Sequence, residues 1–160
     1  MYSVLLSLHS LMRWLVLLSL VFAVYRAYSG WRSNRSYSKL DDRTRIITLT
    51  IVHLQATLGL WLYFVSPVVD YFLKNFGEAI HMREIRFFGM EHITVMVVAV
   101  TLLTIGSVKV KRMETDQQKF KTMFVWYSIS LLIIFLSIPW SFSPFTSRPL
   151  YRLFWITCNF

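Results

Sequence analysis

The sequence has one cysteine, Cys158, in 160 residues, so it cannot form a disulfide within the chain. No Cys-x-x-Cys-His motif is present, which excludes covalent attachment of a c-type haem. There is also no nucleotide-binding motif, phosphate-cradling loop or nucleophile–base arrangement, so nothing supports a kinase or a hydrolase. Acidic residues are few, with 8 Asp and Glu against 17 Lys and Arg.

Apolar residues are abundant instead. They make up 56% of the chain, and the mean hydropathy of +0.51 lies outside the soluble range. We predict a single integral membrane domain over residues 1–160, with no room for a separate soluble domain.

Four apolar segments are each long enough to cross a bilayer, at about residues 2–28, 46–69, 86–108 and 120–140. The first has no basic stretch before it and no cleavage signal after it, so we interpret it as a retained helix. Short connections make neighbouring helices antiparallel, and the predicted fold is an all-α, antiparallel four-helix membrane bundle. The connection over 70–86 and the tail over 141–160 mix apolar and charged residues, which is typical of segments on the membrane surface.

The basic residues concentrate in two connections. The first holds 6 of them and the second holds 5: Arg26, Arg32, Arg35, Lys39, Arg43 and Arg45, then Lys109, Lys111, Arg112, Lys119 and Lys121. By the positive-inside rule both connections face the cytoplasm, which places both termini on the outer, periplasmic side. This bias accounts for the net charge of +9, so we predict no nucleic-acid partner.

Three histidines lie at membrane depth on three different segments: His9, His53 and His92. From the rise of an α-helix, His9 and His92 both lie about 8 Å outward of the midplane, and His53 lies about 12 Å lower. A haem with two imidazole ligands needs histidines on facing helices. The pair His9 and His92 fits that geometry best, whereas His53 with His92 needs a tilted haem or tilted helices.

Neighbouring residues fit the same interpretation. Arg13 follows one turn after His9, and an arginine within a span needs an anion or a polar cavity, such as a haem propionate or Glu91. Gly89 shares a face with His92 and leaves room for a flat group to approach. His81, in a predicted outer loop, needs no partner and is not a predicted ligand.

Two other interpretations remain open. The histidines, Arg13 and Glu91 could form an interhelical polar network without any ligand. Alternatively, His9, His53 and His92 could bind a transition metal, but the depth of His53 argues against their convergence.

Several stretches of the chain carry a family likeness: Leu8-His9-Ser10 with Arg13, His53-Leu54-Gln55 with Leu58-Gly59, Tyr63-Phe64-Val65-Ser66-Pro67, Arg86-Phe87 with Glu91-His92 and Ile105-Gly106, and Ser137-Ile138-Pro139-Trp140. In these stretches the chain resembles the small four-helix "cytochrome b"-type inner-membrane proteins of Bacteroidota. The resemblance covers about residues 4–140. It implies a multi-pass protein of the bacterial inner membrane that binds b-type haem, with His9, His53, His92, Arg13 and Glu91 at the site.

We therefore expect a haem b-binding membrane protein that carries electrons between a quinol or another membrane donor and a partner protein. The alternative is a non-redox accessory subunit that packs against the membrane proteins of a larger complex. Under either hypothesis the protein contacts membrane lipid and acts within an assembly. We favour these two roles over that of a stand-alone enzyme.

Overall fold

The computed structural model describes residues 1–140 as an all-α structure. The predicted tail, 141–160, lies outside the described residues. The elements are α1 (Tyr2–Arg32), α2 (Lys39–Val65), α3 (Pro67–Lys74), α4 (Phe76–Ala79), α5 (Arg83–Arg86), the π-helical turn η1 (Phe87–Glu91), α6 (His92–Arg112) and α7 (Asp116–Ser137).

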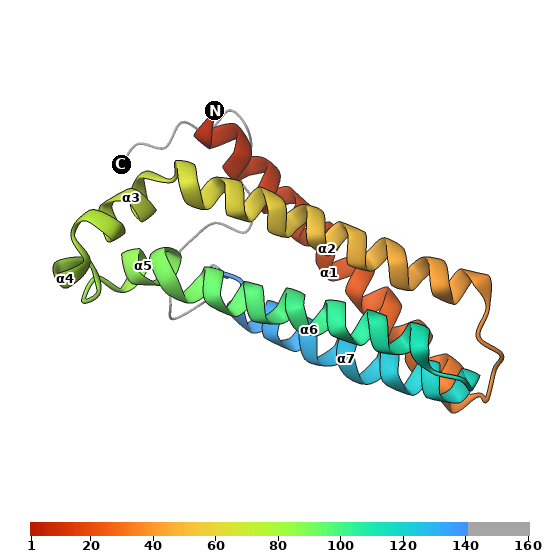
Figure 1. Ribbon diagram of the computed structural model, residues 1–160. Helices are drawn as coiled ribbons and strands as arrows, with labels where there is room; N and C mark the ends of the chain where they lie inside the picture. Colours follow the sequence, from red (N-terminus) through yellow and green to blue (C-terminus); the bar gives the residue numbers. More distant parts are fainter. Residues whose placement is uncertain (141–160) are drawn as a thin grey trace.

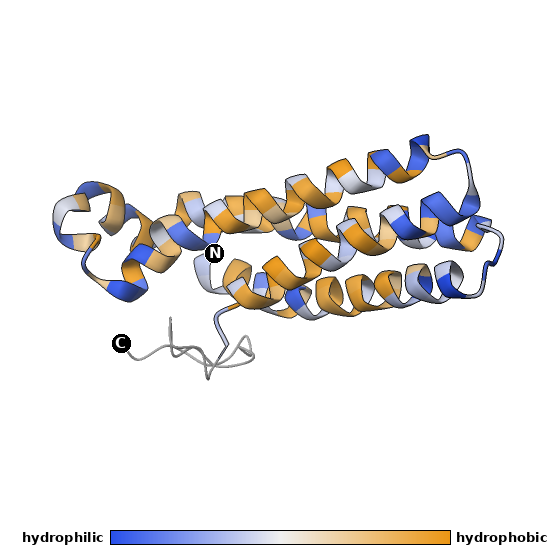
Figure 2. Cartoon of the chain, turned by 90° about the horizontal axis from the view of Figure 1, so that it is seen from below, coloured by the Kyte–Doolittle hydropathy of each residue, from blue (hydrophilic) through white to orange (hydrophobic). Residues whose placement is uncertain are grey.

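Within residues 1–140, four helical stretches are long and apolar enough to cross a membrane. They are α1, α2, the run from α5 through α6, and α7. Each packs antiparallel to the next along the chain (Figure 1). Apolar residues line their length, and hydrophilic residues gather at the two ends of the bundle (Figure 2). The predicted antiparallel arrangement of four apolar helices is confirmed.

The four long helices form a ring in the order α1, α2, α6, α7, and α7 closes back onto α1. Small residues allow close approach in the core, where Ala23, Ala27 and Ala99 have no exposed surface. Of the neighbouring pairs in this ring, α2 and α6 are the least closely packed. The bundle is therefore tighter on three sides than on the fourth.

Helix α2 begins at Lys39, seven residues before the predicted start at 46. A capping box explains the difference, because Ser38 and Asp41 each accept a hydrogen bond from the other's backbone N–H. An equivalent box between Thr115 and Gln118 starts α7 at Asp116. Charged first turns thus continue the helices beyond their apolar segments.

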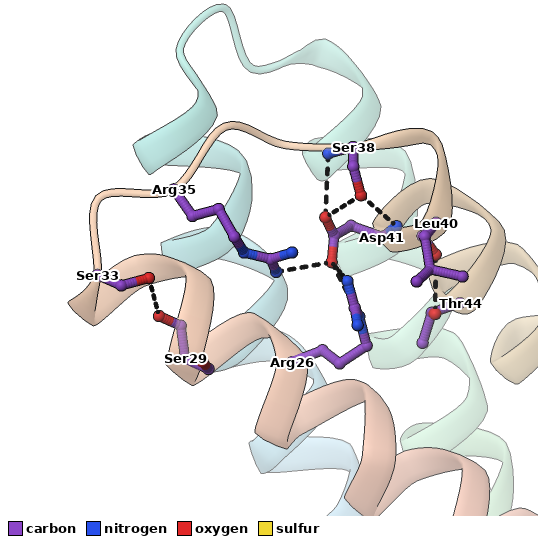
Figure 3. Close-up of polar contacts among 8 residues, drawn as sticks. All are labelled: Arg26, Ser29, Ser33, Arg35, Ser38, Leu40, Asp41 and Thr44. Carbon is purple, nitrogen blue, oxygen red and sulfur yellow. Dashed lines mark hydrogen bonds and ion pairs between the residues drawn. The ribbon is translucent and has the colours of Figure 1, made fainter.

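A buried carboxylate ties the first connection to the bundle (Figure 3). Arg26 Nε and Nη2 donate to Asp41 Oδ1 at 3.0 and 2.7 Å, and Arg35 Nη2 donates to the same oxygen at 3.0 Å. Ser38 N and Oγ donate to Asp41 Oδ2 at 3.0 and 2.6 Å. The Asp41 side chain is 1% exposed. We call Arg26, Arg35, Ser38 and Asp41 the Asp41 cluster.

A second polar cluster links three helices near the same end. Arg45 donates from Nη1 to Ser107 Oγ on α6 at 2.6 Å, and from Nη2 to Asp42 Oδ1 at 2.8 Å. Tyr127 on α7 donates its hydroxyl to the Arg45 carbonyl oxygen at 2.9 Å. We call Asp42, Arg45, Ser107 and Tyr127 the Arg45 cluster, and we call the end of the bundle that holds both clusters the basic end.

The opposite end carries the short helices α3, α4 and α5, and the N-terminus lies there too (Figure 1). Pro67 begins α3, where its fixed φ suits the first helical position and its missing N–H is not needed. Phe72 of α3 is 3% exposed and packs on Gly89 of η1. The connection thus folds back onto the start of the third span.

Candidate cofactor site

A cavity of about 640 Å³ lies inside the bundle at the α3–α5 end. Its walls come from all four long helices and are mostly apolar. The polar groups in the wall include three histidines, one arginine and one glutamine: His9, His53, His92, Arg13 and Gln55. Both the size and the pattern of a few polar groups in an apolar wall are typical of a small-molecule or cofactor site.

His92 is the first residue after the π-helical turn η1, and such turns occur frequently at functional sites. Its Nδ1 lies 3.1 Å from the carbonyl oxygen of Ser137 on α7. A carbonyl oxygen only accepts, so Nδ1 carries the proton and a neutral ring keeps a lone pair on Nε2. Metal-ligating histidines are usually held in this way, by a hydrogen bond from the other ring nitrogen.

His9 lies against α2. Gln55 Nε2 donates to the His9 carbonyl oxygen at 2.9 Å, which fixes the two helices at this level. A Cβ placed on Gly59 would come within 3.0 Å of His9 Cε1, so the glycine provides the space that the imidazole occupies. His9 Nδ1 is buried and has no hydrogen-bond partner among residues 1–140. A buried polar atom without a partner costs about 1–3 kcal/mol, which a bound group could offset.

The structure brings His9 and His92 to the same cavity from α1 and α6. These are the two histidines whose depths match in the sequence.

Arg13 also lines the cavity, one turn from His9. Its guanidinium carbon lies 5.5 Å from the ring centre of Trp14 and 6.0 Å from that of Trp140. Its Nη2 donates to Ser10 Oγ at 3.4 Å. A cation thus borders the cavity, within 6.0 Å of the ring centres of two indoles.

Glu91 does not line the cavity. Its Oε1 accepts from Arg86 Nε at 2.7 Å, so its partner is the arginine five residues earlier in the chain. The structure therefore separates Glu91 from the pair His9 and His92, although it adjoins His92 in the sequence.

His53 lines the same cavity from near the middle of α2 and bonds to α6. Its Nε2 is 2.9 Å from Thr104 Oγ1 on α6. Along α2 it lies six residues from Gly59, the level of His9, which corresponds to about 9 Å. Within residues 1–140 no three His, Cys, Asp or Glu side chains lie together in a way that could hold a metal ion.

The predicted role of Gly89 is wrong. The ring of Phe72 occupies the space beside Gly89, so no flat group approaches the helix there. Tyr63 on α2 further fixes this turn by donating its hydroxyl to the Gly89 carbonyl oxygen at 3.0 Å. Two partners were not predicted from the sequence: Ser137 for His92 and Gln55 for His9.

No protein-family model, curated protein or solved structure matches the chain. The resemblance to the four-helix cytochrome b-type proteins therefore stays a prediction that rests on the quoted residues.

The residues present fit a haem. Two imidazoles reach one cavity from different helices, one with a nitrogen lone pair oriented by a backbone carbonyl and the other with an unpartnered buried nitrogen. Arg13 supplies a cation at the cavity wall. The volume lies within the range of cofactor sites.

Proposed function

We propose that this chain is a b-type haem-binding, multi-pass protein of the bacterial inner membrane. In this role it carries electrons between a membrane donor, such as a quinol, and a partner protein. The observation that carries the proposal is the orientation of the His92 imidazole. Its Nδ1 donates to the Ser137 carbonyl oxygen, which leaves Nε2 unprotonated, and the ring lines the cavity that His9 also lines.

His9 and His92 would hold the haem through their imidazole nitrogens. The Ser137 carbonyl fixes the His92 tautomer and increases the basicity of the ligating nitrogen. Arg13 would pair with a propionate, because it is the cation on the cavity wall. The apolar wall excludes water and lowers the local dielectric constant, which would tune the reduction potential of a bound haem. The bound haem itself supplies the one-electron chemistry.

The orientation follows from the charge distribution. The cavity lies at the end of the bundle opposite the two basic connections. If these connections face the cytoplasm by the positive-inside rule, the termini and the cavity lie on the periplasmic side. Electron exchange with a partner protein would then take place at the periplasmic surface.

The test is the haem content of His92→Ala. The protein is purified in detergent, and a dithionite-reduced minus air-oxidised spectrum is combined with a pyridine haemochrome assay. We expect a sharp α band from the wild-type protein and its loss from His92→Ala. His81→Ala is the matched control, since His81 is exposed and does not line the cavity. A fully haem-loaded His92→Ala protein would overturn the assignment.

The same assay tests the role of His9 through a glycine pair. Gly59→Ala places a methyl group 3.0 Å from His9 Cε1 and forces the ring to shift by a few tenths of an ångström. Gly77→Ala makes the same change where nothing lies within 4 Å. We expect lower haem occupancy or a shifted reduction potential for Gly59→Ala only. Equal behaviour of the two variants would exclude His9 as a ligand.

A second candidate function is a non-redox accessory subunit of a larger membrane complex. The observation in its favour is that His53 and His92 each hydrogen-bond to a neighbouring helix, as expected of interhelical polar contacts. A colourless, well-folded protein that copurifies at fixed stoichiometry with other membrane proteins would establish this function in place of the first.

A further inference from the structure

The cavity opens sideways between α2 and α6. Five of the residues that line it are also exposed on the outer surface of the bundle, three on α2 and two on α6: His53, Thr57, Leu60, Val97 and Thr101. Leu60 and Val97 are 51% and 58% exposed. These helices are the least closely packed neighbours in the ring. We call these five residues the lateral mouth.

The lateral mouth is more polar than a lipid-facing surface requires. His53 lies near the middle of α2, and Thr57 and Thr101 flank it on the two helices. Thr57 satisfies its own hydroxyl by donating to the His53 carbonyl oxygen at 3.0 Å. Of these five side chains, only the imidazole of His53 has two polar atoms, and its own helix cannot provide hydrogen-bond partners for both. Ionisable groups at this depth in a membrane usually have a function.

The hydrogen bonds around His53 determine its tautomer. Thr104 Oγ1 donates its only proton to the Val100 carbonyl oxygen, with an oxygen–oxygen distance of 2.7 Å. It can therefore only accept from His53 Nε2, 2.9 Å away. With the proton on Nε2, a neutral ring has an unprotonated Nδ1 that acts as an acceptor.

An acceptor nitrogen at this position requires a hydrogen-bond donor. Little water reaches the hydrocarbon region, so the donor must come from a lipid-soluble molecule. A hydroquinone has phenolic hydroxyl donors on a ring and an apolar tail that can remain in the lipid. The oxidised quinone has only carbonyl acceptors in place of the hydroxyls, so it leaves Nδ1 without a partner.

We propose that the lateral mouth binds the ring of a membrane quinol, with His53 Nδ1 accepting a hydrogen bond from a quinol hydroxyl. The choice of a quinol among hydroxyl-bearing lipids rests on the proposed function, whereas the position and the acceptor character of the site come from His53 and Thr104. His53 then binds the quinol, which is the electron donor, and is not a haem ligand. The site favours the reduced form of its ligand over the oxidised form.

The experiment compares the binding of a decyl-substituted benzohydroquinone with that of its quinone. Binding to the purified protein in detergent is measured anaerobically by titration calorimetry. We expect the hydroquinone to bind at least tenfold more tightly than the quinone. His53→Ala should weaken hydroquinone binding by about tenfold, the size expected for one lost hydrogen bond, and His81→Ala should leave it unchanged.

Thr104→Val tests the tautomer. The valine removes the oxygen that accepts from Nε2, so the ring proton is no longer held there and Nδ1 can also donate. We expect the preference for hydroquinone over quinone to narrow, while the helix stays folded because valine keeps the shape of threonine. An unchanged preference would contradict the assigned tautomer.

Three results would overturn the proposal: equal affinity for hydroquinone and quinone, unchanged hydroquinone affinity of His53→Ala, or decanol competing as well as the hydroquinone, which would show a general lipid-hydroxyl site. The haem assay is a separate measurement. Hydroquinone binding by a protein without haem would reject the proposed function and keep this site, and a haem-loaded protein without hydroquinone binding would do the reverse.

Discussion

Replacing Asp41 with alanine tests the contribution of the Asp41 cluster to stability. The carboxylate accepts five hydrogen bonds, three of them from Arg26 and Arg35 and two from Ser38. Its side chain is 1% exposed, and that of Arg26 is 18% exposed. Among the described residues, Asp41 is the only carboxylate that pairs with both Arg26 and Arg35, and the substitution removes it.

The expected loss is about 3 kcal/mol in the free energy of unfolding, the lower end of the range for a broken buried ion pair, because the Arg26 and Arg35 side chains left without their carboxylate are 18% and 39% exposed. The lost reciprocal cap at the start of α2 contributes to this loss, at about 0.5–2 kcal/mol by itself. The two contributions are not additive, because both depend on the same carboxylate.

The assay is reversible unfolding in mixed micelles, followed by circular dichroism as the fraction of denaturing detergent rises. Asp70→Ala is the matched control, since Asp70 pairs with Lys74 at 2.8 Å but is 61% exposed. An exposed pair of this kind contributes about 0–1 kcal/mol. If Asp41→Ala loses no more stability than Asp70→Ala, the buried cluster does not stabilise the bundle and the reasoning fails.

Two further predictions concern the packing of α6 on α7 and the stability of the fold at high pH. Gly106→Ala should destabilise the bundle by about 1–3 kcal/mol, measured in the same assay, because the new methyl group collides with Trp126 of α7 close to its backbone; unchanged stability would show that α6 and α7 can separate freely. Burial raises the pKa of Tyr37, in the first connection, to about 12. Its unfolded value is about 10, so the unfolded state loses this proton first and stability should fall between about pH 10 and pH 12. Tyr37→Phe should show a smaller fall over that range, and an identical pH dependence would contradict the pKa assigned to Tyr37.

The four spans are predictable from the sequence because runs of about 20 apolar residues have few alternatives, and short connections impose antiparallel neighbours. The start of α2 is harder to place, because its first turn carries Lys39, Asp41 and Asp42 and lies outside the apolar run. The capping box from Ser38 to Asp41 is nevertheless visible in the sequence, and counting it would have extended the helix to its observed start.

The site is less predictable than the spans. Helix rise alone gives matching depths for His9 and His92, and both line the cavity. The orientation of His92 comes from the carbonyl oxygen of Ser137, and a backbone atom leaves no signal in the sequence. The position of Gly89 was misinterpreted because its neighbour, Phe72, comes from a short helix that folds back onto it.

The two ends of the bundle divide stability from ligand exchange. The Asp41 and Arg45 clusters fasten the basic end, while the cavity and the lateral mouth extend from the middle of the bundle toward the other end, between α2 and α6, the least closely packed neighbours. The polar contacts that hold the basic end are therefore separate from the residues at which a hydrophobic ligand would enter. We expect substitutions at the lateral mouth to alter the residence time of such a ligand while leaving the free energy of unfolding nearly unchanged.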